Sequence, residues 1–292
     1  MEAVQYLDHP AASHPPFVCA FRGWNDGGEA ASVALRYLQE RWRGRVFAHL
    51  DPEEFFDFQV TRPTVRLENG VSRVIDWPRG DFSIASVEGH DVAMFSSGEP
   101  NVRWRAFSRE VVDVASGMGS TLLVTLGAFL TDVPHSRDVP VVGSASDEET
   151  AARLGLARSQ YEGPTGIVGV LHDASIRAGV PSISLWAAVP HYLPPSPNPK
   201  AALALVQRAS ALLGIPVDTS SLTREAREWE RTVARIIEDS DELGEYVRNL
   251  ESTADEGASE EGRLGGGQVS GEDIAAELER FLRERDGGGS SP

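Results

Sequence analysis

Residues 17–43 read FVCAFR, then GWNDGG, then EAASVALRYLQERWR. The first six residues are apolar or rich in strand formers, which predicts a buried strand. The glycine-rich segment that follows is typical of a turn, and the last part has a helical pattern. A strand joined to a helix by a short turn is the repeating unit of α/β proteins.

The same alternation continues to about residue 190 and predicts an α/β fold, a mixed sheet flanked by helices. Asn69 and Gly70 favour the positive φ angles of a two-residue turn, so the segments on either side should form an antiparallel hairpin. Ser146 and Glu149 have the spacing of a capping box at a helix start. The predicted strands are 17–22, 46–50, 64–67, 73–76, 93–96, 121–126, 139–143 and 182–187, and the predicted helices are 29–43, 102–117, 147–154, 166–178 and 199–213.

Composition narrows the class of protein. The 292 residues carry a net charge of −17, and an acidic surface repels phosphate backbones, so we expect no nucleic-acid partner. Cys19 is the only cysteine, which excludes an internal disulfide and fits the cytoplasm. Lys200 is the only lysine, and its position excludes a P-loop. The sequence shows neither a secretory signal nor an apolar run of about 20 residues, so we expect no membrane partner.

The last 76 residues are a distinct acidic unit, with 20 acids against 9 arginines. We divide the chain into an α/β body (1–216), a helical arm (217–250), a disordered linker rich in Glu, Gly and Ser (251–271), a short amphipathic helix (272–286) and a disordered tail (287–292). The short helix needs a groove, because about 13 residues are unstable alone; its apolar face is Ile274, Leu278, Phe281 and Leu282.

Apolar residues in the arm recur at alternating spacings of four and three, which predicts a coiled-coil seam. Gly244 is the expected position of a kink or break. The seam could pack on its own body, on another copy of the chain or on a foreign partner, and we treat it as a candidate interface. Its residues are Leu222, Ala226, Trp229, Val233, Ile236, Ser240, Leu243, Val247 and Leu250, of which only Ser240 is polar.

The glycine turn has two interpretations. Glycines allow close backbone approach, and the N–H groups of the following helix could bind an anion. Asp26 and Glu29 already bring negative charge there, so Asp26 could simply cap the helix. The candidate ligand residues of this turn are Gly23, Trp24, Asn25, Asp26, Gly27 and Gly28.

Two further loops follow predicted strands. Ligands in open α/β sheets bind at the carboxyl ends of strands, so these loops could converge with the glycine turn on one cleft. A lone loop histidine is more often a hydrogen-bonded surface group than a catalyst, and both interpretations stay open. The candidate residues are Gly127, His135 and Arg137 after one strand, and His191 and Tyr192 after another.

The stretch DPEEFFDF at residues 51–58 mixes acids with aromatics. Its acids could serve as an acid–base pair or bind a hard cation. We favour a packed lid or subunit interface formed by Phe55, Phe56 and Phe58. The sequence has no HExxH, EF-hand or GxSxG motif, so we expect no metal, no cofactor and no assigned catalytic residue.

Several ordered motifs over residues 17–250 resemble the bacterial, actinobacterium-like branch of the proteasome assembly chaperone family. They are GWNDGG (23–28), DPE (51–53), FQVTRP (58–63), TLGA (125–128), DVPH (132–135), PHY (190–192) and NPKA (198–201). The resemblance implies a fold similar to nucleoside phosphorylases, a homo-oligomeric body, with a trimer as the first expectation, and a chaperone-type role. Archaeal relatives can end in a hydrophobic residue, Tyr and any residue, whereas this chain ends in Ser-Ser-Pro, which argues against docking by the tail.

Two functions therefore remain in view. The first is an oligomeric assembly-chaperone-like or protein-binding protein with an unknown client. The alternative is a small-molecule enzyme of nucleoside phosphorylase or hydrolase type, in which His135 or His191 would act as acid or base and Arg137 would hold an anion.

Overall fold

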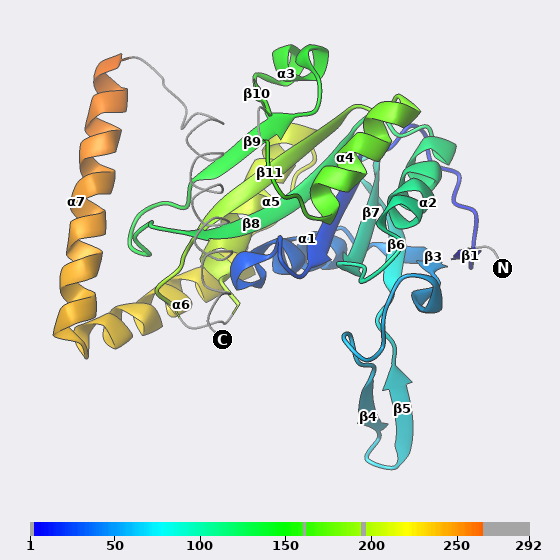
Figure 1. The fold of residues 1–292 in the computed structure, drawn as a ribbon, viewed down its shortest axis with the longest axis horizontal. Coiled ribbons are helices and arrows are strands. Elements are labelled where there is room, and N and C mark those ends of the chain that lie inside the picture. The colour runs from blue at the N-terminus through cyan, green and yellow to red at the C-terminus, as the bar shows by residue number, and fades with distance from the viewer. Residues whose placement is uncertain (1–2, 160–161, 194–196, 265–292) are drawn as a thin grey trace, which may run out of the picture.

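A large mixed sheet runs through the centre of the protein (Figure 1). The computed structural model describes residues 3–159, 162–193 and 197–264. Strands β7, β2, β8 and β11 at its centre are parallel, and β6, β3, β1 and β9 are antiparallel to their inner neighbours. Within the described residues, nine strands lie in the order β1 (Val4–Tyr6), β3 (Arg45–Leu50), β6 (Gly80–Val87), β7 (His90–Gly98), β2 (Phe17–Arg22), β8 (Leu123–Thr131), β11 (Ser182–Pro190), β9 (Val141–Ala145) and β10 (Ala157–Arg158).

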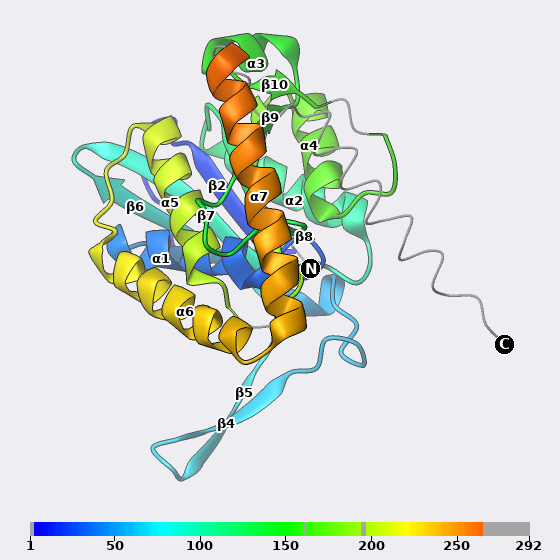
Figure 2. The same ribbon diagram turned by 90° about the vertical axis from the view of Figure 1, so that its left-hand side faces the viewer.

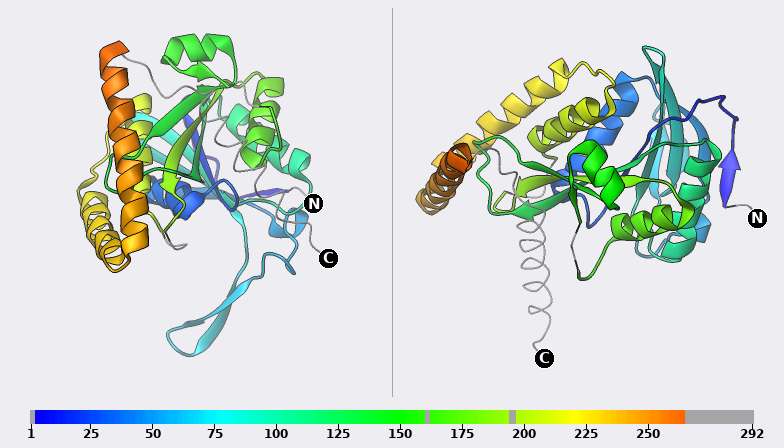
Figure 3. Two further views of the ribbon diagram at one scale, coloured as in Figure 1. Left: turned by 60° about the vertical axis from the view of Figure 1, so that its left-hand side comes forward. Right: turned by 90° about the horizontal axis from the view of Figure 1, so that it is seen from above.

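Helices cover both faces of this sheet (Figure 3). Helices α1 (Ala30–Arg41) and α5 (Pro199–Leu213) pack together on one face, and α2 (Trp104–Gly117) and α4 (Ile167–Ala178) on the other. Successive side chains of a strand point to opposite faces, so alternate residues of β2 enter the two cores. The shorter helices are η1 (Gly27–Glu29), η2 (Pro52–Glu54) and α3 (Glu148–Leu154). The predicted α/β fold with flanking helices and a C-terminal helical arm is confirmed.

A separate two-stranded sheet projects from the body (Figures 1 and 2). It consists of β4 (Thr64–Glu68) and β5 (Ser72–Asp76), joined through Asn69 and Gly70 at φ angles of 52° and 73°. The predicted hairpin and its turn are confirmed. We call residues 60–79 the projecting hairpin.

Some local predictions for the body are wrong, since no strand was predicted at β1, β6 or β10 and one helix cap was assigned to the wrong residue. Strand β6 lies in a segment for which no strand was predicted, since it is largely buried and the polar–apolar alternation of its sequence, GDFSIASV, ends at Ala85. The capping box at Ser146 is also absent. Asp147 is the residue that caps α3, because its Oδ1 accepts the Thr150 N–H at 2.8 Å, and the Ser146 hydroxyl donates to Asp147.

The arm consists of two helices, α6 (Ser220–Glu238) and α7 (Asp241–Leu264). The helix is interrupted at Asp239 and Ser240, between the end of α6 and the start of α7. Gly244 lies inside α7, where its N–H donates to the Ser240 carbonyl at 2.9 Å, so the break expected at Gly244 lies one turn earlier. Ile237 is buried whereas Ile236 is 44% exposed, so a continuous heptad seam is wrong beyond Val233. Residues 251–264 are helical, so the disordered linker does not begin at 251.

The arm packs on its own chain. Helix α6 lies against α5, and Leu222 joins the main core. Val233, Ile237 and Val247 form a smaller buried cluster between α6 and α7, against which Tyr192, Leu193, Trp229 and Leu243 pack. Leu250 is half-buried. The predicted short helix with Ile274, Leu278, Phe281 and Leu282, and the predicted tail, lie outside the described residues.

Candidate functional site

The loops after β8 and β11 meet the arm, and we call this region the arm contact. The Arg137 guanidinium donates two hydrogen bonds to Asp255 of α7, at 2.8 and 2.7 Å. Ser136 donates to Glu251, also on α7. The bidentate bond to Asp255 raises the pKa of Arg137 and lowers that of Asp255. Arg137 therefore binds a carboxylate of its own chain at the position where the sequence suggested an anion ligand.

The two predicted histidines are also engaged there. The Nδ1 of His135 lies 2.9 Å from the Tyr192 hydroxyl, and Lys200 donates to the His135 carbonyl at 2.7 Å. Burial, and then the charge of Lys200, lower the pKa of His135. His191 Nδ1 lies 2.9 Å from a carboxylate oxygen of Asp132.

Aromatic rings close the same contact. The Tyr246 hydroxyl of α7 donates to Asp132 at 2.9 Å, and its ring lies 5.7 Å from that of Tyr192 and 5.9 Å from that of His191. Burial raises the pKa of Tyr192 and of Tyr246 to about 12. His135, Arg137, His191 and Tyr192 thus lie in one region, where they contact the arm or one another instead of lining an open cleft with the glycine turn.

The glycine turn serves mainly to hold the fold. The Asp26 Oδ1 accepts the N–H groups of Ala31 at 2.8 Å and Ser32 at 3.2 Å, so Asp26 occupies the start of α1. Burial raises the pKa of this carboxyl group. Gly28 has a φ of 58°, and its carbonyl accepts the N–H of Asn198 at 2.7 Å. The capping interpretation of Asp26 is therefore the one that the geometry supports, because the N–H groups expected to bind an anion already have an acceptor.

Asn25 connects the turn to the opposite face of the sheet. Its Nδ2 donates to Glu99 Oε1 at 3.3 Å, and the same oxygen accepts the first N–H of α4, from Ile167, at 3.0 Å. Gly23 has a φ of 142°, and a Cβ there would lie 3.0 Å from that of Glu99. Glu99 could not be singled out from the sequence, because a carboxylate after an apolar strand is a common surface residue.

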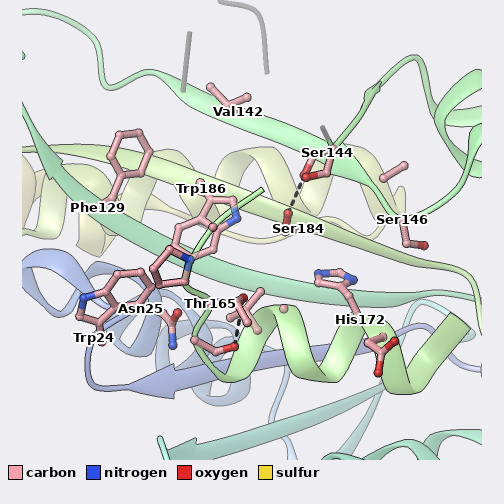
Figure 4. A pocket seen from close by; sticks show the side chains of 18 of the residues that line it. Trp24, Asn25, Phe129, Val142, Ser144, Ser146, Thr165, His172, Ser184 and Trp186 are labelled. Atoms are coloured by element: carbon pink, nitrogen blue, oxygen red, sulfur yellow. Dashed lines mark hydrogen bonds between the residues drawn. The ribbon is translucent and has the colours of Figure 1, made fainter. Parts of the chain in front are cut away.

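A pocket of about 460 Å³ lies on this face, between β8, β11, β9 and α4 (Figure 4). Trp24 and Asn25 line it, but His135, Arg137, His191 and Tyr192 do not. The predicted loops therefore do not converge on one cleft. Gly127 is buried beneath one wall, where a Cβ would lie 2.5 Å from the Trp186 ring.

Most of the residues that line the pocket were not predicted from the sequence. Trp186 stands in an apolar strand and His172 in a helix, where residues of these types are usually structural. His172 bonds through Nδ1 to the Ser182 hydroxyl at 2.7 Å and through Nε2 to that of Thr125 at 3.1 Å. Burial lowers its pKa to about 4. His172 is therefore neutral near pH 7, and both of its nitrogens are occupied.

The predicted aromatic interface is partly wrong. Phe55 and Phe56 are 1% and 5% exposed, and Phe55 packs edge-on against Phe107 with ring centroids 5.4 Å apart. They belong to the core. Phe58 packs against Trp77, 4.9 Å away, at the base of the projecting hairpin.

Over residues 3–159, 162–193 and 197–264, no group of three or more His, Cys, Asp or Glu side chains is placed to hold a metal ion. Among the helices of these same ranges, none combines the length and the hydropathy that crossing a membrane requires.

Comparison with known proteins decides the family. The model of the PAC2 family matches residues 20–237, most of the chain. The chain belongs to the PAC2 family. This confirms the resemblance to proteasome assembly chaperones of the bacterial branch that the motifs predicted.

Solved PAC2 structures resemble the chain closely. A PAC2 family protein from Streptomyces avermitilis is 47% identical with a TM-score of 0.74, covering 80% of this chain and 99% of that one. A proteasome-assembly chaperone homologue from Mycobacterium tuberculosis is 42% identical with a TM-score of 0.72, covering 79% and 99%. PbaB of Pyrococcus furiosus, an archaeal proteasome activator, is 16% identical with a TM-score of 0.63, covering 80% and 97%, and shows the PAC2 fold alone. No curated protein matches the chain.

Proposed function

We propose that this protein is a homo-oligomeric, assembly-chaperone-like protein that acts on a protein client. Its family and its likeness to a proteasome-assembly chaperone homologue support this role. The observation that carries the proposal is the projecting hairpin, which extends away from the body (Figure 2) and whose apolar residues Val65, Leu67 and Ile75 are exposed. An enzymatic role has no comparable support, because His135, His191 and Arg137, the candidate residues for such a role, are engaged in the arm contact.

The hairpin has one apolar face. Val65 pairs directly with Ile75, and Leu67 with Arg73, so these four side chains share a face. Val65, Leu67 and Ile75 are 59%, 60% and 49% exposed. A lone two-stranded hairpin is marginally stable in water, so covering this face would stabilise it. An exposed apolar surface of this kind marks a protein contact.

We propose that a second copy of the chain covers this face. Residues 60–79 carry four arginines and two acids, whereas α6, α7 and their flanks, residues 217–264, carry 14 acids and six arginines. The hairpin and α7 lie far apart in one molecule (Figure 1), so their opposite charges can meet only between copies. A head-to-tail contact between two different surfaces closes into a ring when the rotation allows. A three-membered ring is the form we propose.

Light scattering tests the oligomer. We expect a mass near three times the 31.6 kDa of one chain. The triple variant Val65→Ser, Leu67→Ser, Ile75→Ser should lower that mass, while Val74→Ser, on the opposite face of the same hairpin, should not. Salt should also lower the mass, because it screens opposite charges. A monomeric wild-type protein refutes the oligomer, and a triple variant that keeps the wild-type mass refutes the hairpin contact.

The second part of the proposal, that the protein acts on a protein client, needs a separate test. Tagged protein is used to capture bound proteins from its own cells, and each candidate is then purified and mixed with it. We expect one candidate to form a complex of defined stoichiometry in that second step. If every captured protein fails to bind when purified, the chaperone-like role is wrong even where the oligomer is right.

A further inference from the structure

The pocket between β8, β11, β9 and α4 is suited to a small molecule. Its volume of about 460 Å³ is within the usual range for ligand sites, roughly 300–1,000 Å³. It lies beside the turn that follows β2 and next to the C-terminal half of β8, two adjacent parallel strands of the sheet. The carboxyl ends of parallel strands are where open α/β sheets bind ligands.

Aromatic side chains from three elements form its walls (Figure 4). Trp24 comes from the glycine turn, Phe129 from β8 and Trp186 from β11. The Phe129 and Trp186 rings lie 6.5 Å apart at 59°. All three residues are only partly buried, so their rings keep accessible surface. Aromatic walls favour a flat, apolar or aromatic ligand.

Glycine at position 127 sets the position of one wall. Gly127 pairs with Trp186 across β8 and β11, and a Cβ there would lie 2.5 Å from the Trp186 ring. The indole can therefore lie directly over the strand. A side chain at 127 would displace it and change the pocket.

The pocket offers no positive charge to an anion. None of the described residues that line it is lysine or arginine, and its one formally charged residue, Asp173, is paired with Arg177 at 3.0 Å. His172 is neutral. The first N–H of α4 is already bonded to Glu99. A phosphate or carboxylate would meet no positively charged side chain among the described lining residues, which is unfavourable for an anion that must lose its water.

Polar groups remain for a neutral ligand. The hydroxyls of Ser144 and Ser184 lie 2.9 Å apart in the pocket wall, and each keeps capacity for a further hydrogen bond. At the other end, Asn25 is 2% exposed, and its Oδ1 accepts no hydrogen bond from the described part of the chain. These groups favour a ligand with polar edges.

We propose that this pocket binds an uncharged, flat heteroaromatic molecule, held among Trp24, Phe129 and Trp186 with a polar edge towards Ser144 and Ser184. This site is independent of the proposed protein contact, because none of its lining residues belongs to the hairpin or to the arm. Ligand binding can therefore be tested without reference to the client.

Matched neutral and anionic compounds test the proposal on the full chain. Saturation-transfer NMR and calorimetry are performed with adenosine against AMP and with indole-3-carboxamide against indole-3-carboxylate. We expect at least one neutral member to bind, and its anionic counterpart to bind at least about tenfold more weakly, because the anion would be desolvated without a cation. If no neutral compound binds, or if the anions bind as well, the proposal is wrong.

A variant that fills the pocket locates the binding. Val142 lines the pocket and is partly buried on β9, so Val142→Phe should abolish binding of the neutral compound. Val46→Phe is the same exchange at a 36% exposed position on β3, outside the pocket, and should leave binding unchanged. Binding that survives in folded Val142→Phe overturns the assignment. Light scattering on both variants should give the wild-type mass, which separates this test from that of the oligomer.

Discussion

Val247→Ala should weaken the packing of α7 on the body more than Arg137→Ala does, which removes the ionic contacts of Arg137 with α7. Val247 is 4% exposed in the cluster with Val233 and Ile237. Deleting two buried carbon atoms costs about 1.6 kcal/mol at 0.8 kcal/mol each, and the remaining cavity raises this to about 2.5 kcal/mol. Arg137 and Asp255 keep 41% and 59% of their side-chain surface exposed, so Arg137→Ala should cost only about 0.2–1 kcal/mol.

Hydrogen exchange on the α7 amides measures this difference, because α7 can open without unfolding the sheet. The free energies above correspond to an opening constant raised about 15- to 70-fold by Val247→Ala and at most about fivefold by Arg137→Ala. Both variants are compared at one protein concentration, with the mass checked by light scattering. If Arg137→Ala opens α7 as much as Val247→Ala, the arm is held by its charges and the reasoning is wrong.

Other predictions concern the core, pH and the pocket wall. Phe55→Ala should lower the free energy of unfolding by about 3–5 kcal/mol in urea titrations, because Phe55 is core, whereas an interface residue would change the oligomer mass instead. The pKa of His172 falls from 6.5 to about 4 on folding, so the unfolded chain binds more protons between these values. Stability should therefore fall as pH drops from 6.5 to 4, by up to about 3 kcal/mol, and His172→Gln should reduce that slope; an unchanged slope contradicts the assignment. Gly127→Val should shift the tryptophan emission of the protein, and this shift should be lost when Trp186 is replaced by Phe, while Gly117→Val, at a position with open space beside it, should cause no shift.

Much of the body could be predicted from local patterns. The strand, glycine turn and helix of residues 17–43 and the Asn69-Gly70 hairpin were predicted because each depends on neighbouring residues. Strand β6 was missed because it is largely buried and because the polar–apolar alternation of residues 81–84 ends at Ala85. The register of the arm was wrong for another reason. The helix break at Asp239 and Ser240 has a local signal that the heptad pattern obscured, because the Ser240 hydroxyl accepts the Leu243 N–H at 3.4 Å and two acids, Asp241 and Glu242, lie in the first turn of α7.

The sequence predicted which residues of the candidate site lie near one another, but not which other residues they contact. Strand ends did bring His135 and His191 to one region, as the α/β rule requires. The sequence could not show that Asp255 and Glu251, more than 100 residues later, would occupy Arg137 and Ser136. Contacts over such separations depend on the tertiary fold and leave no periodic signal.

The arm contact bears directly on function. The described structure engages one ring nitrogen of each histidine, His135 Nδ1 with Tyr192 and His191 Nδ1 with Asp132. The Arg137 guanidinium is bonded to Asp255 of α7, so an anion could bind Arg137 only after α7 had left, which would also break the Tyr246 and Val247 contacts. The projecting hairpin needs no such rearrangement, since its apolar face is already exposed. Its exposure costs stability in an isolated chain, and a partner removes that cost on binding. The proposed role in protein association accounts for the exposed apolar face of the hairpin, whereas an enzymatic role does not account for it.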